Sequence, residues 1–261
     1  MAKIKKHPKN RDKEFWGVVK RIIEKADIVL EILDARMPEI TRNKRLESYV
    51  EKFGKPIVFV INKADIVSRT TIKNIKSNYK GLSYVLTSAK GSGVIDDLVK
   101  VIKTIVKKEY IKVAFVGYPN TGKSSIINRL SKGGRARTSS ESGFTKGLQL
   151  INGKGDLMLF DTPGVIPFDE MDETKMGLVS GVSPAKLEDP ELVVYELIEM
   201  FKKNNPFALQ DAYGIDPNQE TEDIINEIGK NSNMLKKGGI VDERRVSIQI
   251  IIDWHKGKIK L

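Results

Sequence analysis

The sequence predicts an α/β fold: a doubly wound, mostly parallel sheet followed by a small helical domain. Short apolar runs rich in β-branched residues alternate with stretches of helical periodicity from about residue 27, as strands and covering helices do. Polar motifs follow directly after the predicted strands, at the edge where such sheets bind ligands. The alternation stops beyond residue 176. We therefore expect a sheet domain over 26–176 and a helical domain over 177–261.

Each element of the sheet domain has its own signal. Strands are expected where β-branched residues gather in short runs, and helices where apolar residues recur every three or four positions. The predicted strands are 28–33, 56–61, 82–87, 111–116 and 156–160, and the predicted helices are 43–53, 68–78, 94–107 and 123–131. Residues 132–147 are rich in Gly, Ser and Arg without periodicity, and we expect them to form a mobile loop.

The helical domain begins with a recognisable start signal. Asp189 before Pro190 predicts an N-cap with proline in the first helical position, and an apolar stripe follows it. Further helices are expected at 219–230 and 241–256, the latter opening at Asp242. We therefore read the C-terminal third as helices without a sheet of their own.

Charge and composition bound the function. The 261 residues contain 45 Lys and Arg against 34 Asp and Glu, a net charge of +11, and residues 1–25 hold nine bases against three acids. Such a basic N-terminal arm or helix attracts polyanions, with RNA the expected one, although a solvated, solubilising arm is the alternative. The chain has no cysteine and no apolar run near the ~18 residues of a membrane span. A soluble cytoplasmic protein without a membrane partner, acting as a monomer, is expected.

The strongest motif is the stretch GYPNTGKS at 117–124, a Walker A loop between a predicted strand and a predicted helix. Its glycines let backbone N–H groups turn toward phosphates, Lys123 can reach the β- and γ-phosphates, and Ser124 can ligate Mg²⁺. The residues expected to bind phosphate are Asn120, Thr121, Gly122, Lys123, Ser124 and Ser125. An ordinary structural turn would rarely combine this spacing with this context.

A second motif, DTPG at 161–164, follows the last predicted strand. Asp161 is expected to hold Mg²⁺ through water, and the Gly164 N–H can meet the γ-phosphate. The motif alone would be ordinary turn chemistry, and it gains its meaning from the Walker A loop before it.

The stretch NKAD at 62–65 selects the base. The Asp65 carboxylate can accept from the N1–H and exocyclic amine of guanine, whereas adenine offers no such pair of donors. Asn62 can bind the purine edge, and Lys63 can cover the ring with its alkyl stem. The companion stretch TSAK at 87–90 supplies Ser88, Ala89 and Lys90, with the Ala89 N–H near the guanine O6 and Lys90 over the base. These residues favour GTP and GDP over ATP.

The order of these motifs resembles that of the circularly permuted YlqF/YawG family of GTPases, over nearly the whole chain. In that family NKxD and SAK precede the P-loop, a switch threonine and DxPG, as they do here. The stretch DAR at 34–36 and the C-terminal stretch 238–259 are similar to further family elements, although Asp34 and Arg36 can equally form a salt bridge that caps a strand. The resemblance implies a circularly permuted P-loop GTPase that assists assembly of the large ribosomal subunit by binding the subunit or its precursor through rRNA.

The resemblance also implies parts of a mechanism. Val165 stands where Ras-like enzymes carry a water-orienting glutamine, so slow intrinsic hydrolysis is expected. Asn120 occupies the position that ligates K⁺ in potassium-dependent relatives, where the ion acts like an arginine finger. Thr145 is our choice for the switch threonine that closes on Mg²⁺ with GTP, with Thr138, Ser139 and Ser140 as alternatives. We expect Lys123, Thr145, Gly164 and Asn120 to carry catalysis.

Two other functions stay open at this point. A signalling or tRNA-modifying GTPase would share the nucleotide site without acting on the ribosome. A P-loop ATPase or metabolite kinase would share the Walker A loop, but NKAD and SAK argue against it.

Overall fold

The computed structural model describes residues 8–88, 94–132, 150–160 and 172–261, with side chains from Trp16 onward in the first helix. The chain forms two compact units. The first comprises the residues up to Asp65 together with 79–169, and the second comprises 66–78 together with 170–261. Within the described ranges, no helix is both long enough and apolar enough to cross a membrane.

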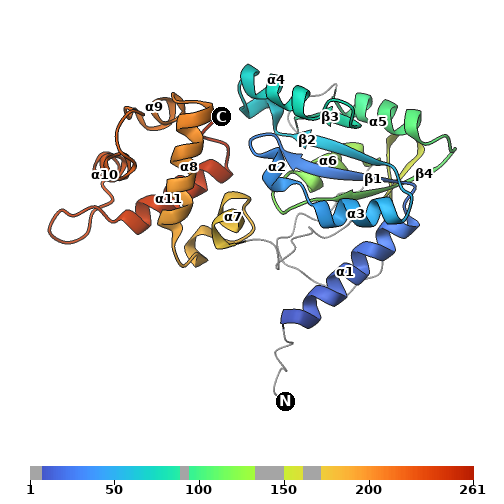
Figure 1. The fold of residues 1–261 in the computed structure, drawn as a ribbon, viewed down its shortest axis with the longest axis horizontal. Helices are drawn as coiled ribbons and strands as arrows, with labels where there is room; N and C mark the ends of the chain where they lie inside the picture. The colour runs from blue at the N-terminus through green and yellow to red at the C-terminus, as the bar shows by residue number, and fades with distance from the viewer. Residues whose placement is uncertain (1–7, 89–93, 133–149, 161–171) are drawn as a thin grey trace, which may run out of the picture. The chain divides into compact units, whose positions relative to one another are not determined.

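The first unit is built on a sheet of six strands in the order β3-β2-β1-β4-β6-β5 (Figure 1). All neighbouring pairs are parallel except β5 with β6. The strands are β1 (Ile28–Asp34), β2 (Ile57–Asn62), β3 (Tyr84–Leu86), β4 (Ile111–Val116), β5 (Leu150–Asn152) and β6 (Leu157–Phe160). Short 3₁₀ turns occur at Ala64–Ile66 and Lys154–Asp156.

Helices cover both faces of this sheet because its strands are apolar on both sides (Figure 1). One face packs against α5 (Val94–Ile105) and α6 (Lys123–Leu130), with Leu98, Ile102 and Ile127 in the buried cluster. The other face packs against α1 (Pro8–Lys25) and α3 (Lys44–Lys52), and α2 (Pro38–Thr41) precedes α3. The strands are therefore buried between two helical layers.

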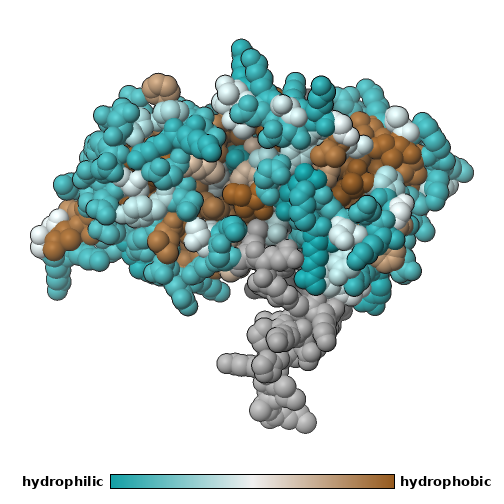
Figure 2. Space-filling view, viewed as in Figure 1, coloured by the Kyte–Doolittle hydropathy of each residue, from teal (hydrophilic) through white to brown (hydrophobic). Residues whose placement is uncertain are grey.

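The first helix belongs to this core. Trp16, Val19, Ile22 and Ile23 are buried against the sheet, and the Trp16 ring lies 5.3 Å from that of Tyr49 on α3. The second half of the basic N-terminal segment is thus a helix whose apolar side chains pack against the sheet. In the view of the protein surface in Figure 2, hydrophilic residues predominate.

The strand order reverses between β1 and β4. From β1 the chain runs outward through β2 to β3, and it then returns to place β4 on the other side of β1. Ligands of doubly wound sheets bind at the carboxyl ends of the strands at such a reversal. Only residues 106–110 separate α5 from β4, and Asp27, just before β1, accepts hydrogen bonds from Lys108 Nζ at 2.6 Å and the Lys112 N–H at 2.8 Å.

The second unit is helical. Its helices are α4 (Arg69–Asn78), α7 (Glu173–Leu178), α8 (Pro190–Asn204), α9 (Ala208–Tyr213), α10 (Thr221–Asn231) and α11 (Glu243–His255), with a 3₁₀ turn at Pro184–Lys186. Helices α8 and α11 form its centre, where the rings of Phe201 and Trp254 lie 5.6 Å apart. The segment 66–78 joins this unit, and the Leu261 N–H donates to the Ile66 carbonyl at 3.2 Å.

The predicted fold class is confirmed, and the five predicted strands and the helices predicted at 43–53, 68–78, 94–107 and 123–131 match the observed elements to within two residues at each end, although the helix at 68–78 (α4) belongs to the second unit. Strand β5 and the short helices α2, α7 and α9 were not predicted. Pro190 does open α8, but the Asp189 side chain makes no capping hydrogen bond there. Asp242 caps α11 as expected, with its Oδ1 accepting from the Arg245 N–H at 3.3 Å. The predicted mobile loop 132–147 lies almost wholly outside the described residues.

Candidate nucleotide-binding site

The Walker A loop runs from the end of β4 to the start of α6, and its backbone enters the left-handed region of positive φ three times. Gly117, Asn120 and Gly122 have positive φ values of 139°, 58° and 99°. An added Cβ at Gly117 would collide with the Ile32 carbonyl oxygen of β1, and one at Gly122 would collide with the Asn62 side chain. Such a loop directs successive N–H groups inward, and it therefore suits an anion.

Lys123 opens α6 and lies against this loop. Its Nζ donates to the carbonyl oxygens of Gly117 at 2.9 Å and Tyr118 at 2.8 Å, and its side chain is buried. Burial lowers the pKa of this ammonium to about 8. Because an ammonium has three N–H donors, these two bonds leave one for a phosphate oxygen at the loop.

Asn62 joins the guanine motif to the Walker A loop. This last residue of β2 is buried, its Nδ2 donates to the Thr121 carbonyl at 2.8 Å, and its Oδ1 accepts from Thr87 Oγ1 at 3.0 Å. The Ala64 N–H donates to the Thr87 carbonyl at 3.0 Å. The single amide thus holds NKAD, TSAK and the Walker A loop together at the carboxyl edge of the sheet.

Two further contacts support this arrangement. Arg129 on α6 donates to the Ser88 carbonyl at 2.7 Å, which ties the helix after the Walker A loop to the start of SAK. Thr121 is buried, and its Oγ1 donates to the Tyr118 carbonyl at 2.9 Å inside the loop. The Thr121 hydroxyl therefore stabilises the conformation of the loop.

Lys63 makes an ion pair that sequence reasoning did not predict. Its Nζ lies 2.7 Å from Asp34 Oδ2 at the end of β1, and Arg36 binds the same carboxylate through Nε at 3.0 Å and Nη2 at 2.7 Å. The predicted possibility of an Asp34–Arg36 salt bridge is confirmed. Burial alone would raise the pKa of Asp34, but the Arg36 and Lys63 charges outweigh it and lower that pKa to about 2.

The structure brings most of the predicted nucleotide-binding residues to one edge. Asp65 and Asn120 are exposed there, Ser124 is partly buried, and Ser125 is exposed on the first turn of α6. Ala89, Lys90, Thr145, Asp161 and Gly164 lie outside the described residues, as do Val165 and the alternatives Thr138, Ser139 and Ser140. Their predicted roles stay predictions.

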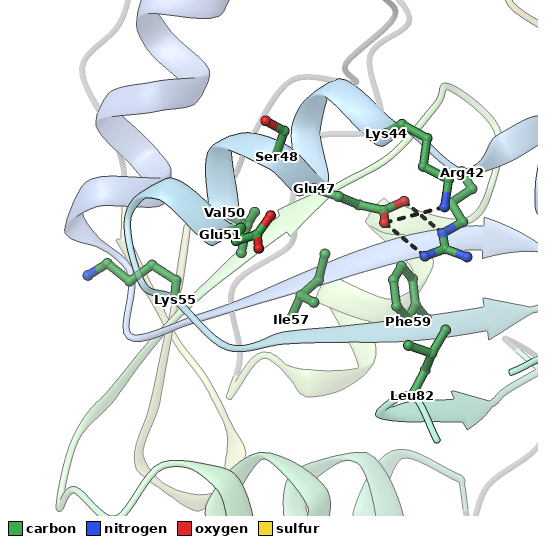
Figure 3. Close-up of a pocket in the computed structure, with 10 residues that line it drawn as sticks. All are labelled: Arg42, Lys44, Glu47, Ser48, Val50, Glu51, Lys55, Ile57, Phe59 and Leu82. Carbon is green, nitrogen blue, oxygen red and sulfur yellow. Dashed lines mark hydrogen bonds and ion pairs between the residues drawn. The ribbon is translucent and has the colours of Figure 1, made fainter. Parts of the chain in front are cut away.

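A separate pocket of about 490 Å³ lies between α3 and the face of the sheet (Figure 3). It extends from Ile57 at the start of β2 to Phe59 in the middle of that strand, with Leu82 just before β3. The Arg42 guanidinium lies 4.5 Å above the Phe59 ring and is paired with Glu47 at 2.7 Å. None of the predicted nucleotide-binding residues lines this pocket.

Comparison with known families decides the identity of the fold. The model of the RsgA GTPase family matches residues 6–171, which is more than half of the chain, and that of the 50S ribosome-binding GTPase family matches residues 112–234. The chain belongs to the RsgA GTPase family. It is a circularly permuted GTPase, as the order of NKAD and the Walker A loop predicts.

Relatives of this circularly permuted GTPase include proteins from archaea and eukaryotes. An uncharacterized GTP-binding protein of Methanocaldococcus jannaschii is 35% identical over 93% of this chain and 65% of its own length. Nucleolar GTP-binding protein 2 of Kluyveromyces lactis is 32% identical over 96% of this chain and 50% of its own length. The chain thus spans between half and two thirds of these relatives.

The solved structures of YlqF from T. maritima have the same fold. The GDP-bound structure superposes with a TM-score of 0.66 and 24% identity over 93% of this chain and 95% of that one. The GNP-bound structure gives the same score over 97% and 95%. The likeness extends over both units of the circularly permuted GTPase.

Proposed function

We propose that this protein binds GTP and GDP at the carboxyl edge of its sheet and hydrolyses GTP slowly. The observation that carries the proposal is the Asn62 amide, which joins NKAD to the Thr121 carbonyl of the Walker A loop and to Thr87 before SAK. The base-reading motif and the phosphate-binding loop are thereby joined directly by side-chain hydrogen bonds. The family supports GTP hydrolysis in general terms.

Asp65 is proposed to read guanine with its carboxylate. It is exposed at the site edge, on the 3₁₀ turn that follows Lys63. The test is Asp65→Asn, which replaces one acceptor oxygen with an NH₂ donor. The preference of the protein should therefore change from GTP to xanthosine triphosphate, because xanthine carries an oxygen where guanine carries its exocyclic amine. The matched control is Asp97→Asn on the exposed side of α5, which should keep GTP. If the Asp65→Asn variant bound GTP and xanthosine triphosphate with the same affinities as the wild type, the base-recognition scheme would be overturned.

The phosphates and ions are assigned to the loop and the first turn of α6. The Walker A N–H groups and Lys123 suit the phosphates, and Ser124, Thr145 and Asp161 are proposed to ligate Mg²⁺. Asn120, exposed at a positive φ of 58°, is proposed to ligate K⁺. Bound there, the cation would supply positive charge to the γ-phosphate during hydrolysis. Hydrolysis rates in KCl and in NaCl, for the wild type and Asn120→Ala, test this assignment.

We further propose that the nucleotide acts as a switch in assembly of the large ribosomal subunit, with rRNA as the partner. The match to a 50S ribosome-binding GTPase family and the net charge of +11 support this role. In the helical unit, Arg245, Lys256 and Lys260 are exposed. Arg244 and Lys258 are exposed as well, but Arg244 donates to the Leu187 and Glu188 carbonyls and Lys258 pairs with Asp253.

The test is cosedimentation with large subunits in GDP and in a non-hydrolysable GTP analogue. Nucleotide-dependent binding supports the assembly role. GTP binding without cosedimentation would favour the second candidate, a signalling or tRNA-modifying GTPase. The cytoplasmic location stays a prediction from the sequence, and the eukaryotic relatives carry nucleolar names.

The coupling of nucleotide state to the helical unit is part of the proposal. Residues 161–164 lead through the chain directly into α7, which is fixed to α11: Trp254 Nε1 donates to the Leu178 carbonyl at 3.0 Å, and His255 Nε2 lies 2.6 Å from the Gly177 carbonyl. A displacement at Gly164 would therefore act on the helical unit through α7. Equal hydrogen-exchange protection of 177–261 with GDP and with a GTP analogue would contradict it.

A further inference from the structure

The Asp34 carboxylate at the end of β1 is bound by two cationic side chains, whereas a simple ion pair has one. Asp34 Oδ1 accepts from the Arg36 N–H at 3.1 Å and Nε at 3.0 Å, and Oδ2 accepts from Arg36 Nη2 and from Lys63 Nζ, both at 2.7 Å. The Asp34 and Arg36 side chains are only 4% and 1% exposed. One buried anion therefore serves two cations, and each is within charge-assisted hydrogen-bond distance.

The backbone brings the two motifs together. In the parallel register Asp34 is the partner of Asn62, and the Ala35 N–H donates to the Asn62 carbonyl at 2.8 Å. Lys63 follows with a positive φ of 65°, a conformation that is uncommon for a side-chain-bearing residue. The Lys63 side chain thus begins beyond the end of β2 and ends at the carboxyl end of β1.

The Lys63 side chain therefore lies along the carboxyl edge of the sheet, where doubly wound sheets bind their ligands. Strand β1 lies between β2, which carries NKAD, and β4, which carries the Walker A loop, and the strand order reverses at β1 and β4. The lysine stem is held by the backbone at Lys63 and by Asp34 at its ammonium, so it is ordered along the edge that carries the base-reading motif. A free lysine stem would lose rotamer entropy when a purine ring packed on it, whereas this one is already ordered.

We propose that Asp34 is a positioning residue of the nucleotide site: it holds the Lys63 ammonium so that the lysine stem is preordered to cover the purine, and Arg36 holds Asp34. The inference rests on the proposed guanine-nucleotide binding and assigns to the DAR stretch a part in it. The competing interpretation is a salt bridge that only stabilises the fold.

A double-mutant cycle separates these interpretations. The probe is mant-labelled GDP, and the measurement is its dissociation rate from the full-length protein by stopped flow. We expect Asp34→Asn and Lys63→Met each to speed dissociation on the order of 10-fold, the effect of losing one charge-assisted hydrogen bond. The double variant should be no faster than either single variant, because both remove the same anchor. Additive effects, or an Asp34→Asn rate equal to that of the wild type, would overturn the proposal.

Two further variants keep the test decisive. If Asp34→Asn does not fold because two buried cations lose their anion, Arg36→Lys keeps the charge balance but loses the two-bonded fork. It should show an intermediate rate, and an unchanged rate would count against the proposal. Glu47→Gln is the matched control, because it breaks the similar Arg42–Glu47 fork in the pocket under α3, which none of the predicted nucleotide-binding residues lines, and it should leave dissociation unchanged. A wild type that does not bind mant-GDP would refute the proposed function itself, which is a different outcome.

Discussion

Asn62 Nδ2 donates a 2.8 Å hydrogen bond to the Thr121 carbonyl oxygen, across 59 residues of sequence. The same amide accepts from Thr87 Oγ1, so the shape of the Walker A loop depends on a residue of the guanine motif. In this permuted chain the two motifs are joined by side chains although they lie far apart along the backbone. The Asn62 side chain therefore has a structural role in addition to any contact with a base.

Replacement of Asn62 by alanine should destabilise the protein. The buried Thr87 hydroxyl and Thr121 carbonyl would both lose their partner, and each such loss costs about 1–3 kcal/mol. We expect the free energy of unfolding to fall by roughly 2–4 kcal/mol in urea denaturation. Asn74→Ala, at an exposed position of α4, is the control and should change stability little. A wild-type midpoint for Asn62→Ala would show that the bridge does not support the loop.

Most of the sheet could be predicted because its strands carry β-branched runs and its helices carry long periodic stripes. Strand β5 is three residues long, and α7 and α9 are six residues each, so their patterns are too short to stand out. The motif residues could be named from their residue types and spacing, and their roles in nucleotide binding stay predictions.

The contacts among these residues could not be predicted. Whether Asp34 meets Lys63 depends on the register of β1 and β2, which pairs Asp34 with Asn62. Local sequence left open whether Asp34 and Arg36 form a simple cap, and the third partner, 29 residues from Asp34, gave no signal. The burial of Glu31 was equally hidden, since a single acid in an apolar strand reads the same whether its neighbours cover it or not.

Glu31 should make stability depend on pH. Its side chain is fully buried in β1, Oε1 accepts from the Asn43 N–H at 2.7 Å, and Oε2 has no hydrogen-bond partner among the described residues. Burial raises the pKa of this carboxyl from 4.5 to about 8, against the lowering effect of the Asn43 N–H. Between these two values the folded protein keeps a proton that the unfolded chain has lost. The free energy of unfolding therefore falls as pH rises through this window.

The Glu31→Gln variant stays neutral and should lose this dependence. Relative to the wild type it should gain stability as pH rises from 5 to 8, at about 1.4 kcal/mol for each unit of pKa difference that is crossed. Urea denaturation across that range measures the gain, and the exposed Glu51→Gln serves as the control. Parallel pH profiles for wild type and Glu31→Gln would contradict the assignment.

Lys123 should make nucleotide affinity depend on pH in alkaline solution. Its pKa of about 8 in the nucleotide-free loop means that the ammonium loses its proton just above neutrality, whereas bound phosphates favour the charged form. Raising pH from 7.0 to 8.5 should therefore weaken GDP binding roughly fourfold, the ratio of the charged Lys123 populations at the two pH values for that pKa. Equilibrium titration with mant-GDP measures this change, and Lys100→Ala on the exposed face of α5 should show the same profile as the wild type. Constant affinity over this range would mean that Lys123 stays charged.

Gly177 tests the packing of the helical unit, and Gly17, in α1 of the first unit, is an unpacked glycine for comparison. A Cβ added at Gly177 in α7 would lie 2.7 Å from Val193 Cγ2 and 3.1 Å from its Cγ1, whereas one added at Gly17 in α1 meets nothing within 4 Å. We expect Gly177→Ala to destabilise the protein by about 1–3 kcal/mol, because α7 must move away from α8. Gly17→Ala should stabilise it by about 0.5–1 kcal/mol, since alanine loses less backbone entropy in a helix. Thermal unfolding of both variants measures these opposite shifts. If Gly177→Ala matched the wild type, α7 would be loosely packed on α8, and it could not transmit a displacement from residues 161–164 to the helical unit.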